Sequence, residues 1–265
     1  MARVIAVANQ KGGVGKTTTA INIAAGLAAA ERRTLLIDGD PQGNASSGVG
    51  VRPGVGEPTS YDVLLDPAVA GAAVVRGVQF NNLDILPSSP DMAAAEIELA
   101  AVQGRESRMR DAVDLLRERY DYIIIDCPPS LGLITLNMLV AADSVLIPLQ
   151  CEYYALEGLS QLMNTITAIQ HGASPSLVLE GILLTMFDSR LNLSRQVSED
   201  ARAHFGDLVF QSVVPRNIRL AEAPSFGKPI IAYDLASVGA QAYLGVVNEI
   251  IVKTDSSRPP GLVAA

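Results

Sequence analysis

An octapeptide, KGGVGKTT at residues 11–18, stands between a short apolar run and a helical pattern. Residues 4–8 are apolar and mostly β-branched and predict a buried strand, whereas residues 17–30, rich in Ala, Ile and Leu, predict a helix. Glycines in this position let backbone N–H groups turn toward a phosphate, and the positive end of the helix dipole points to the same place. The segment therefore predicts a phosphate-binding loop within an α/β fold.

The residues of this loop are all candidate nucleotide ligands: Lys11, Gly12, Gly13, Val14, Gly15, Lys16, Thr17 and Thr18. The lysine that begins the helix, Lys16, can reach the β- and γ-phosphates, and the hydroxyl of Thr17 can ligate Mg²⁺. The expected ligands are thus a nucleotide and Mg²⁺.

Apolar runs and helical patterns alternate along the rest of the chain. We expect strands at residues 34–37, 83–86, 122–125, 144–148, 179–185 and 208–214, and helices at 105–119, 155–170 and 237–252. This alternation predicts an α/β fold with a mostly parallel twisted sheet and helices on both faces. Aromatic residues make up 5% of the chain and Trp is absent, so Ala, Val, Leu and Ile must fill the core.

Neither an internal repeat nor a change in composition divides the chain. Residues 1–253 are predicted to form a single P-loop NTPase domain. Residues 254–265, which contain two prolines, are predicted to be a disordered tail, and the Gly- and Pro-rich residues 48–58 a loop.

Three aspartates follow apolar strands. Asp38 and Asp40 stand two residues apart after the second expected strand, and Asp126 ends the very apolar run at 122–125. Ligands of open α/β sheets bind at the carboxyl ends of the strands, so these carboxylates should face the phosphate loop. Asp126 is predicted to hold Mg²⁺, directly or through water.

The phosphate loop departs from the ordinary pattern G-x-x-x-x-G-K-[ST], because Gln10 stands where the first glycine would be and Lys11 follows it. This resembles the deviant loop K-G-G-x-G-K-[ST] of the ParA/MinD superfamily. The segments at 38–44 (DGDPQGN) and 126–130 (DCPPS) follow in that superfamily's order, and those at 150–158 and 214–225 resemble its later segments. The resemblance spans residues 3–252 and points to ParA/Soj-like partitioning ATPases.

The resemblance implies roles for the site residues, with ATP and Mg²⁺ as cofactors. Lys11 would reach across a dimer interface to the partner's nucleotide, which implies an ATP-dependent homodimer with slow hydrolysis. Lys11, Lys16 and Asp40 would be catalytic, Asp40 by orienting or activating the attacking water. The remaining assignments are the Mg²⁺ site, Thr17, Asp38 and Asp126, and the adenine contacts, Pro215 and Asn217.

The formal net charge of −8 argues against a nucleic-acid binder, since phosphate contacts need Lys and Arg, although a local patch is enough. Residues 186–231 carry six basic and five acidic side chains, a net +1, whereas residues 1–150 carry twelve and seventeen, a net −5. ParA-like ATPases bind duplex DNA non-specifically as ATP dimers, so the resemblance selects cations from the later region. The candidate DNA contacts are Arg190, Arg195, Arg216, Arg219 and Lys228.

The resemblance further implies a cytoplasmic, nucleoid-associated protein with a ParB-like partner that stimulates hydrolysis, and no membrane binding. The absence of a long DNA-reading segment before residue 11 favours a small Soj-like protein. Two alternatives are a MinD-like membrane-cycling regulator of cell division and a metabolic or kinase-like enzyme. The tail, with two prolines and few cations, makes a poor membrane helix. Cys127 and Cys151 have no metal-like spacing and are assigned no role.

Overall fold

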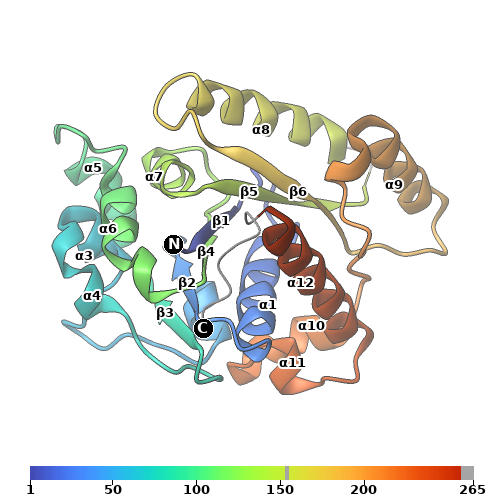
Figure 1. Cartoon of the computed structure of the whole chain (residues 1–265), viewed down its shortest axis with the longest axis horizontal. Coiled ribbons are helices and arrows are strands. Elements are labelled where there is room, and N and C mark those ends of the chain that lie inside the picture. Colours follow the sequence, from blue (N-terminus) through green and yellow to red (C-terminus); the bar gives the residue numbers. More distant parts are fainter. Residues whose placement is uncertain (153–154, 258–265) are drawn as a thin grey trace.

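The computed structural model describes residues 1–152 and 155–257 and contains one six-stranded sheet (Figure 1). The strand order is β3-β2-β4-β1-β5-β6, and every neighbouring pair is parallel. The strands are β1 (Arg3–Val7), β2 (Thr34–Asp38), β3 (Leu83–Leu86), β4 (Tyr122–Asp126), β5 (Ser144–Gln150) and β6 (Val178–Thr185). The prediction of a mostly parallel α/β sheet is confirmed.

Helices cover both faces of the sheet, as Figure 1 shows for α7 and α8 on one side and α1 and α12 on the other. The first face carries α3 (Ser60–Leu65), α4 (Ala70–Ala73), α5 (Met92–Glu98), α6 (Arg108–Leu116), α7 (Leu133–Ala141), α8 (Ala155–Gln170) and α9 (Asn192–Phe205). The second carries α1 (Lys16–Ala29), α2 (Asn44–Gly48), α10 (Ile218–Glu222), α11 (Ile230–Tyr233) and α12 (Val238–Ser257).

The central strand β4 is apolar up to its last residue, Asp126, because both of its faces are buried. In β4, Ile123 and Ile125 pack into the core beneath α6 and α7, whereas Tyr122 and Ile124 pack against α1. Alternate residues of a strand point to opposite faces, so a strand between two helical layers must be apolar at every position. This explains why the most apolar strand segments in the sequence show no alternation of apolar and polar residues.

Two expectations about the C-terminal third were wrong. Residues 208–214 form no regular strand: Phe210 and Val214 donate to carbonyls of β6 (3.0 and 2.9 Å), but the two N–H groups after Phe210 donate to the carboxylate of Glu249 on α12 (2.9 and 2.7 Å). The segment is therefore drawn away from the sheet edge. The start of the expected tail is also helical, since α12 continues to Ser257; residues 258–265 lie outside the described residues.

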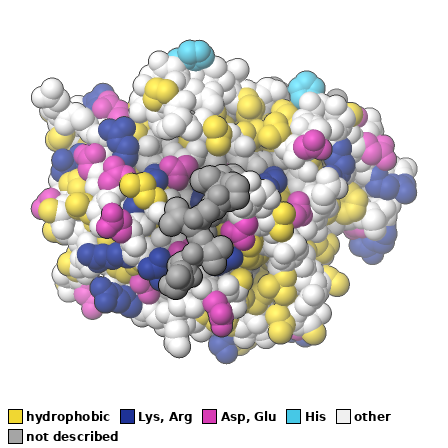
Figure 2. Space-filling model, viewed as in Figure 1, with side chains coloured by type: hydrophobic (Ala, Val, Ile, Leu, Met, Phe, Trp, Pro, Cys, Tyr) yellow, Lys and Arg dark blue, Asp and Glu magenta, His cyan; other side chains and the backbone are white. Residues whose placement is uncertain are grey.

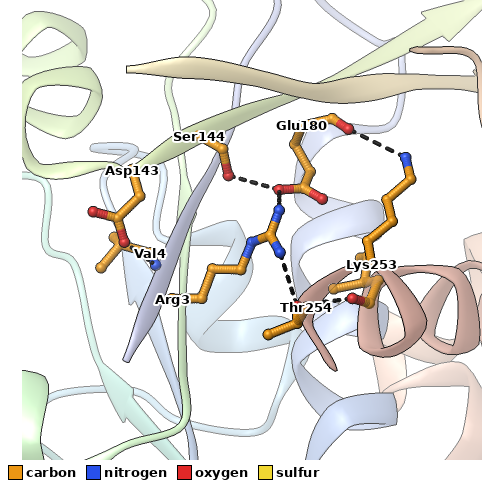
Figure 3. A network of polar contacts seen from close by, with 8 residues as sticks. Arg3, Val4, Asp143, Ser144, Glu180, Lys253 and Thr254 are labelled. Carbon is orange, nitrogen blue, oxygen red and sulfur yellow. Dashed lines mark hydrogen bonds and ion pairs between the residues drawn. The ribbon is translucent and has the colours of Figure 1, made fainter. Parts of the chain in front are cut away.

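A buried polar network anchors α12 at the amino ends of the strands (Figure 3). Arg3 donates to Glu180 (2.5 Å) and to Thr254 (2.9 Å), and Ser144 donates to the same Glu180 oxygen (2.8 Å). Lys253 also donates to the Glu180 carbonyl (3.4 Å). Because these contacts join β1, β5, β6 and α12, they fix the helix that carries part of the site at its other end.

Candidate nucleotide-binding site

The phosphate loop joins the carboxyl end of β1 to α1. Gly13 and Gly15 have positive φ angles of 75° and 88°, and Gly15 occupies the N-cap position of α1 in the left-handed conformation. A Cβ added at Gly12, Gly13 or Gly15 would meet nothing within 4 Å. The loop is therefore an open cradle of backbone N–H groups at a helix N-terminus, which is the arrangement that binds phosphates.

Two polar side chains hold this loop in place. Asn9 donates to the carbonyl of Pro148 on β5 (2.8 Å) and accepts from the N–H of Lys11 (3.0 Å). Thr185, the last residue of β6, donates to the carbonyl of Val14 (2.9 Å). Sequence reasoning missed both residues, since the available signal was only a polar residue at the end of an apolar strand.

The two lysines of the loop lie in different environments. Lys16 is 7% exposed, and its ammonium donates to the Lys11 carbonyl (3.1 Å) across the cradle. Burial lowers the pKa of Lys16, while the charges of Asp126 and Asp40 oppose this shift. Lys11 instead forms an ion pair with Glu152 (2.9 Å) in which both side chains are more than a third exposed.

Asp38 and Asp126 lie side by side, because they are register partners at the carboxyl ends of β2 and β4. Both are fully buried, and neither oxygen of Asp126 makes a hydrogen bond among the described residues. Burial and the charge of Asp38 raise the pKa of Asp126 well above its usual range. The Thr17 hydroxyl, which lies close to Asp126 without the geometry of a hydrogen bond, and the charge of Lys16 oppose this shift. A buried carboxylate without a partner, beside a threonine and a phosphate cradle, fits a Mg²⁺ site.

The Asp38 carboxylate is already engaged within the chain. It accepts from the N–H and hydroxyl of Ser46 (2.7 and 2.6 Å) and from the N–H of Asp40 (3.2 Å). Burial raises the pKa of Asp38 to about 6 despite these bonds. Asp38 therefore fixes α2 and the turn before it, whereas Asp40, 8% exposed, accepts from the N–H of Gln42 (2.9 Å) at the rim of the site.

A cavity of about 220 Å³ adjoins the cradle and is lined by Gly15 and Thr18. Pro215 and Asn217 line the same cavity, so the structure brings the expected adenine contacts to the phosphate loop. Its other walls are Thr185, Met186, Val214, Arg216, Leu220, Ala221 and Tyr243. Met186 and Tyr243 could not be assigned from the sequence, because β6 and α12 reach the loop only through the fold.

The two cysteines take no part in this site. Burial raises the pKa of the Cys127 thiol far above its usual range, and it raises that of Cys151 to about 11. Both thiols therefore stay protonated at neutral pH and behave as small apolar groups.

The candidate DNA contacts lie beyond the cavity. A bridge between Phe187 and Pro215 brings the loop that carries Arg190 beside Arg216. Hydrogen bonds from Arg190 lower the pKa of Asp188 to about 2, and the charge of Arg216 acts in the same direction. Basic side chains are visible over and beside α9 in Figure 2.

The remaining candidates differ in their partners. Arg219 pairs with Glu222 (3.0 Å) and Asp234 (3.5 Å). Arg195, on α9, contacts the amide oxygen of Asn192. Lys228 is exposed and has no ion pair within the part of the chain that the structure describes. The structure therefore gathers Arg190 and Arg216 and places the others on neighbouring elements.

Known proteins agree with this geometry. A family model described as an AAA domain matches residues 2–179. The chromosome partitioning protein ParA of Myxococcus xanthus is 56% identical over 258 residues, which cover 97% of this chain and 90% of that protein. The sporulation initiation inhibitor protein Soj of Bacillus subtilis is 52% identical, covering 94% of this chain and 98% of that one.

The chain belongs to the ParA/Soj family of chromosome-partitioning ATPases.

A solved structure supports the same fold. It is described as the cobyrinic acid a,c-diamide synthase of Mycobacterium smegmatis with a bound ATP analogue and magnesium. It is 39% identical, covers 97% of this chain and 98% of its own, and superposes with a TM-score of 0.83. The chain is accordingly a P-loop ATPase with ATP and Mg²⁺ as its cofactors, and the open loop and the buried Asp126 carboxylate fit these ligands.

Proposed function

We propose that the chain is an ATP-dependent dimerising switch that binds DNA non-specifically in its ATP state. It drives chromosome or plasmid segregation together with a ParB-like partner. The observation that carries this proposal is the pairing of a complete cradle for one nucleotide with a second lysine, Lys11, that points out of the cradle to an exposed ion pair. A lysine so placed is available to a second nucleotide.

The chain's own residues divide the work of ATP binding and hydrolysis. The loop N–H groups and Lys16 hold the phosphates, and the cavity formed by Pro215 and Asn217 takes the adenine. Thr17 and Asp126 would hold Mg²⁺, with Asp38 beside them, and the ion would supply charge neutralisation at the phosphates. Asp40, at the rim, orients the attacking water.

The position of Lys11 supports dimerisation. Its ion pair with Glu152 is half-exposed and therefore weak, so Lys11 can exchange it for phosphate oxygens of a partner's ATP. A second cation at the phosphates stabilises the charge that develops during transfer, as an arginine finger does. Loss of the γ-phosphate removes this contact and releases the dimer.

DNA binding would use the surface around Arg190 and Arg216, with Arg195, Arg219 and Lys228 as further contacts. Arg216 also lines the nucleotide cavity, which gives a direct route from nucleotide state to DNA contact. Doubling this surface in a dimer raises the number of phosphate contacts, so an acidic chain can bind DNA in one state alone. Such a protein would lie on the nucleoid.

The ParB-like partner and the choice among alternative functions are supported by charge, by helix length and by the relatives. An acidic chain suits a basic peptide from a ParB-like partner. Within the described residues, no helix is long and apolar enough to cross a bilayer. The prediction that the tail, residues 254–265, forms no membrane-binding helix stays a prediction, because residues 258–265 lie outside the described part. Residues 153–154, within the segment 150–158 that resembles the superfamily, lie outside it too. Partitioning is favoured over a synthase activity because the relatives named for partitioning are the more similar ones.

The decisive experiment measures binding to random-sequence duplex DNA with ATP, ADP or no nucleotide at fixed moderate salt. We expect binding with ATP alone, and a steep loss as salt is added. Arg190→Glu and Arg216→Glu should abolish it, whereas Arg110→Glu, on α6 at the far side of the molecule, should not (Figure 1). Binding that ignores the nucleotide, or equal losses in all three variants, would contradict the proposal.

A further inference from the structure

A second cavity lies at the opposite end of the sheet from the nucleotide. Its volume is about 590 Å³, and it is bordered by residues that precede β2, β3 and β4. Three arginines line it, Arg33, Arg76 and Arg119, and the other lining residues are Gly77, Asn81, Asn82, Asp84 and Tyr120. In Figure 2 basic side chains gather over this part of the molecule, around β3 and the turn before β4. None of these residues takes part in the nucleotide site.

The fold holds two of these arginines on rigid backbone. Arg76 follows Val75, which exchanges two backbone hydrogen bonds with Ile85 of β3 (2.8 and 2.9 Å). Arg119 ends a 3₁₀ turn whose first residue, Arg117, is paired with Asp143 (2.7 Å). Both arginines therefore line one cavity from separate segments whose backbones are held in place, which lowers the entropic cost of binding a shared ligand.

One carboxylate, that of Asp84, also lines the cavity. Asp84 accepts from the Tyr120 hydroxyl (2.7 Å) and from the N–H of Gly77 (2.9 Å). Arg33 is matched by Asp121 (3.0 Å). Within residues 1–152 and 155–257, neither Arg76 nor Arg119 has an ion-pair partner. With Arg33 paired to Asp121, the cavity wall carries the charges of Arg76 and Arg119 against that of Asp84, and so stays net positive in a chain whose net charge is −8.

We propose that this cavity binds a small molecule carrying at least two linked phosphate groups, held by Arg76 and Arg119 and oriented by Asn81 and Asn82. A planar guanidinium matches phosphate oxygens in pairs, so two of them on separate segments suit a diphosphate better than a single anion. The cavity volume lies in the range of small-molecule sites, roughly 300–1,000 Å³. A concave wall with amide donors also suits a compact ligand better than a duplex, which needs an extended basic surface.

The test is a calorimetric titration of the full chain with pyrophosphate. The phosphate loop is first saturated with a non-hydrolysable ATP analogue and excess Mg²⁺, so that the nucleotide site cannot take the probe. We expect one equivalent to bind, and a double variant, Arg76→Gln with Arg119→Gln, to bind at least about tenfold more weakly, since hydrogen bonds to charged groups are lost. A matched control, Arg52→Gln with Arg110→Gln, changes two arginines outside the cavity and should bind as the unaltered chain does.

A second titration, with GDP, identifies the class of ligand, and three results would overturn the proposal. GDP under the same conditions distinguishes a nucleoside diphosphate, which should bind more tightly than pyrophosphate, from a phosphate-only ligand. Saturable binding that both double variants retain, or no binding at all, would overturn the proposal. So would loss of DNA binding without loss of pyrophosphate binding in the Arg76/Arg119 variant, because the cluster would then be a DNA contact. The pyrophosphate and GDP titrations do not depend on whether the ATP dimer binds DNA.

Discussion

Replacing Asp126 by Asn should stabilise the chain without nucleotide and remove its response to Mg²⁺. Asp126 is fully buried, makes no hydrogen bond among the described residues and lies beside Asp38. An unsatisfied buried polar group costs about 1–3 kcal/mol, and an amide at this position can donate to the Asp38 carboxylate. We expect the free energy of unfolding to rise by about 1.5 kcal/mol, which for a domain of this size moves Tm by about 3–6 °C.

With Mg²⁺ and an ATP analogue bound, the unaltered chain should become more stable than the Asp126→Asn variant. The unaltered chain gains stability from Mg²⁺ and an ATP analogue, about 2.7 kcal/mol when the ligand is at a hundred times its Kd. The Asp126→Asn variant should gain much less, because the carboxylate that fits the metal is gone. Differential scanning calorimetry of both proteins, with and without Mg²⁺ and analogue, measures the four Tm values. A variant that is less stable than the unaltered chain without ligand would refute the reasoning.

The pH dependence has a definite sign. Burial raises the pKa of Asp126, and that of Asp38 to about 6, whereas an unfolded Asp titrates near 3.9. The folded state therefore binds more protons than the unfolded state between these values, and the stability without ligand falls as the pH rises from about 4 through about 6. Asp126→Asn should fall less over this range, because one of the two buried carboxyls is gone. Equal slopes in urea titrations at several pH values would contradict this.

Three further predictions concern the surrounding residues. Gly39→Ala places a Cβ 2.8 Å from the backbone carbonyl oxygen of Asp126 on β4. It should lower the free energy of unfolding by about 1–3 kcal/mol, measured by urea titration. An unchanged urea midpoint would count against so close an approach of Gly39 to β4. Glu152→Gln frees Lys11 from an exposed ion pair worth at most about 1 kcal/mol. Sedimentation with an ATP analogue should therefore find a dimer dissociation constant at most about fivefold lower. A higher dissociation constant would contradict this. Thr185→Val removes the hydrogen bond to Val14 and should weaken ATP binding about tenfold in calorimetry, and unaltered affinity would exclude that role.

The sequence was sufficient for the sheet and the chemistry of the phosphate loop. Strand–glycine-loop–helix is a local arrangement, because residues close in the chain build the cradle themselves, and Gly13 and Gly15 have the positive φ angles that only glycine adopts freely. Asp38 and Asp126 were also readable as partners, since parallel strands bring their carboxyl ends to one edge.

The apolar pattern at residues 208–214 predicted a strand that the structure does not form. This run is apolar and β-branched enough for a strand, but the carboxylate of Glu249 on α12 takes two of the N–H groups that a ladder would use. A hydrogen bond to a residue so far along the chain leaves no trace in local composition. The end of α12 was misplaced for a similar reason, because Arg3 holds Thr254 from β1.

What the sequence by itself determined is therefore the class of fold and the local conformation of the predicted phosphate loop, both set by neighbours in the chain. The tertiary structure decided which distant groups surround them: Thr185 and Tyr243 at the nucleotide, Glu152 on Lys11, and Arg76 with Arg119 at the far cavity. These contacts depend on the order in which strands pair and on how helices pack over them. The local pattern of residue types does not show which residues far apart in the chain will be in contact, because that depends on the folded topology.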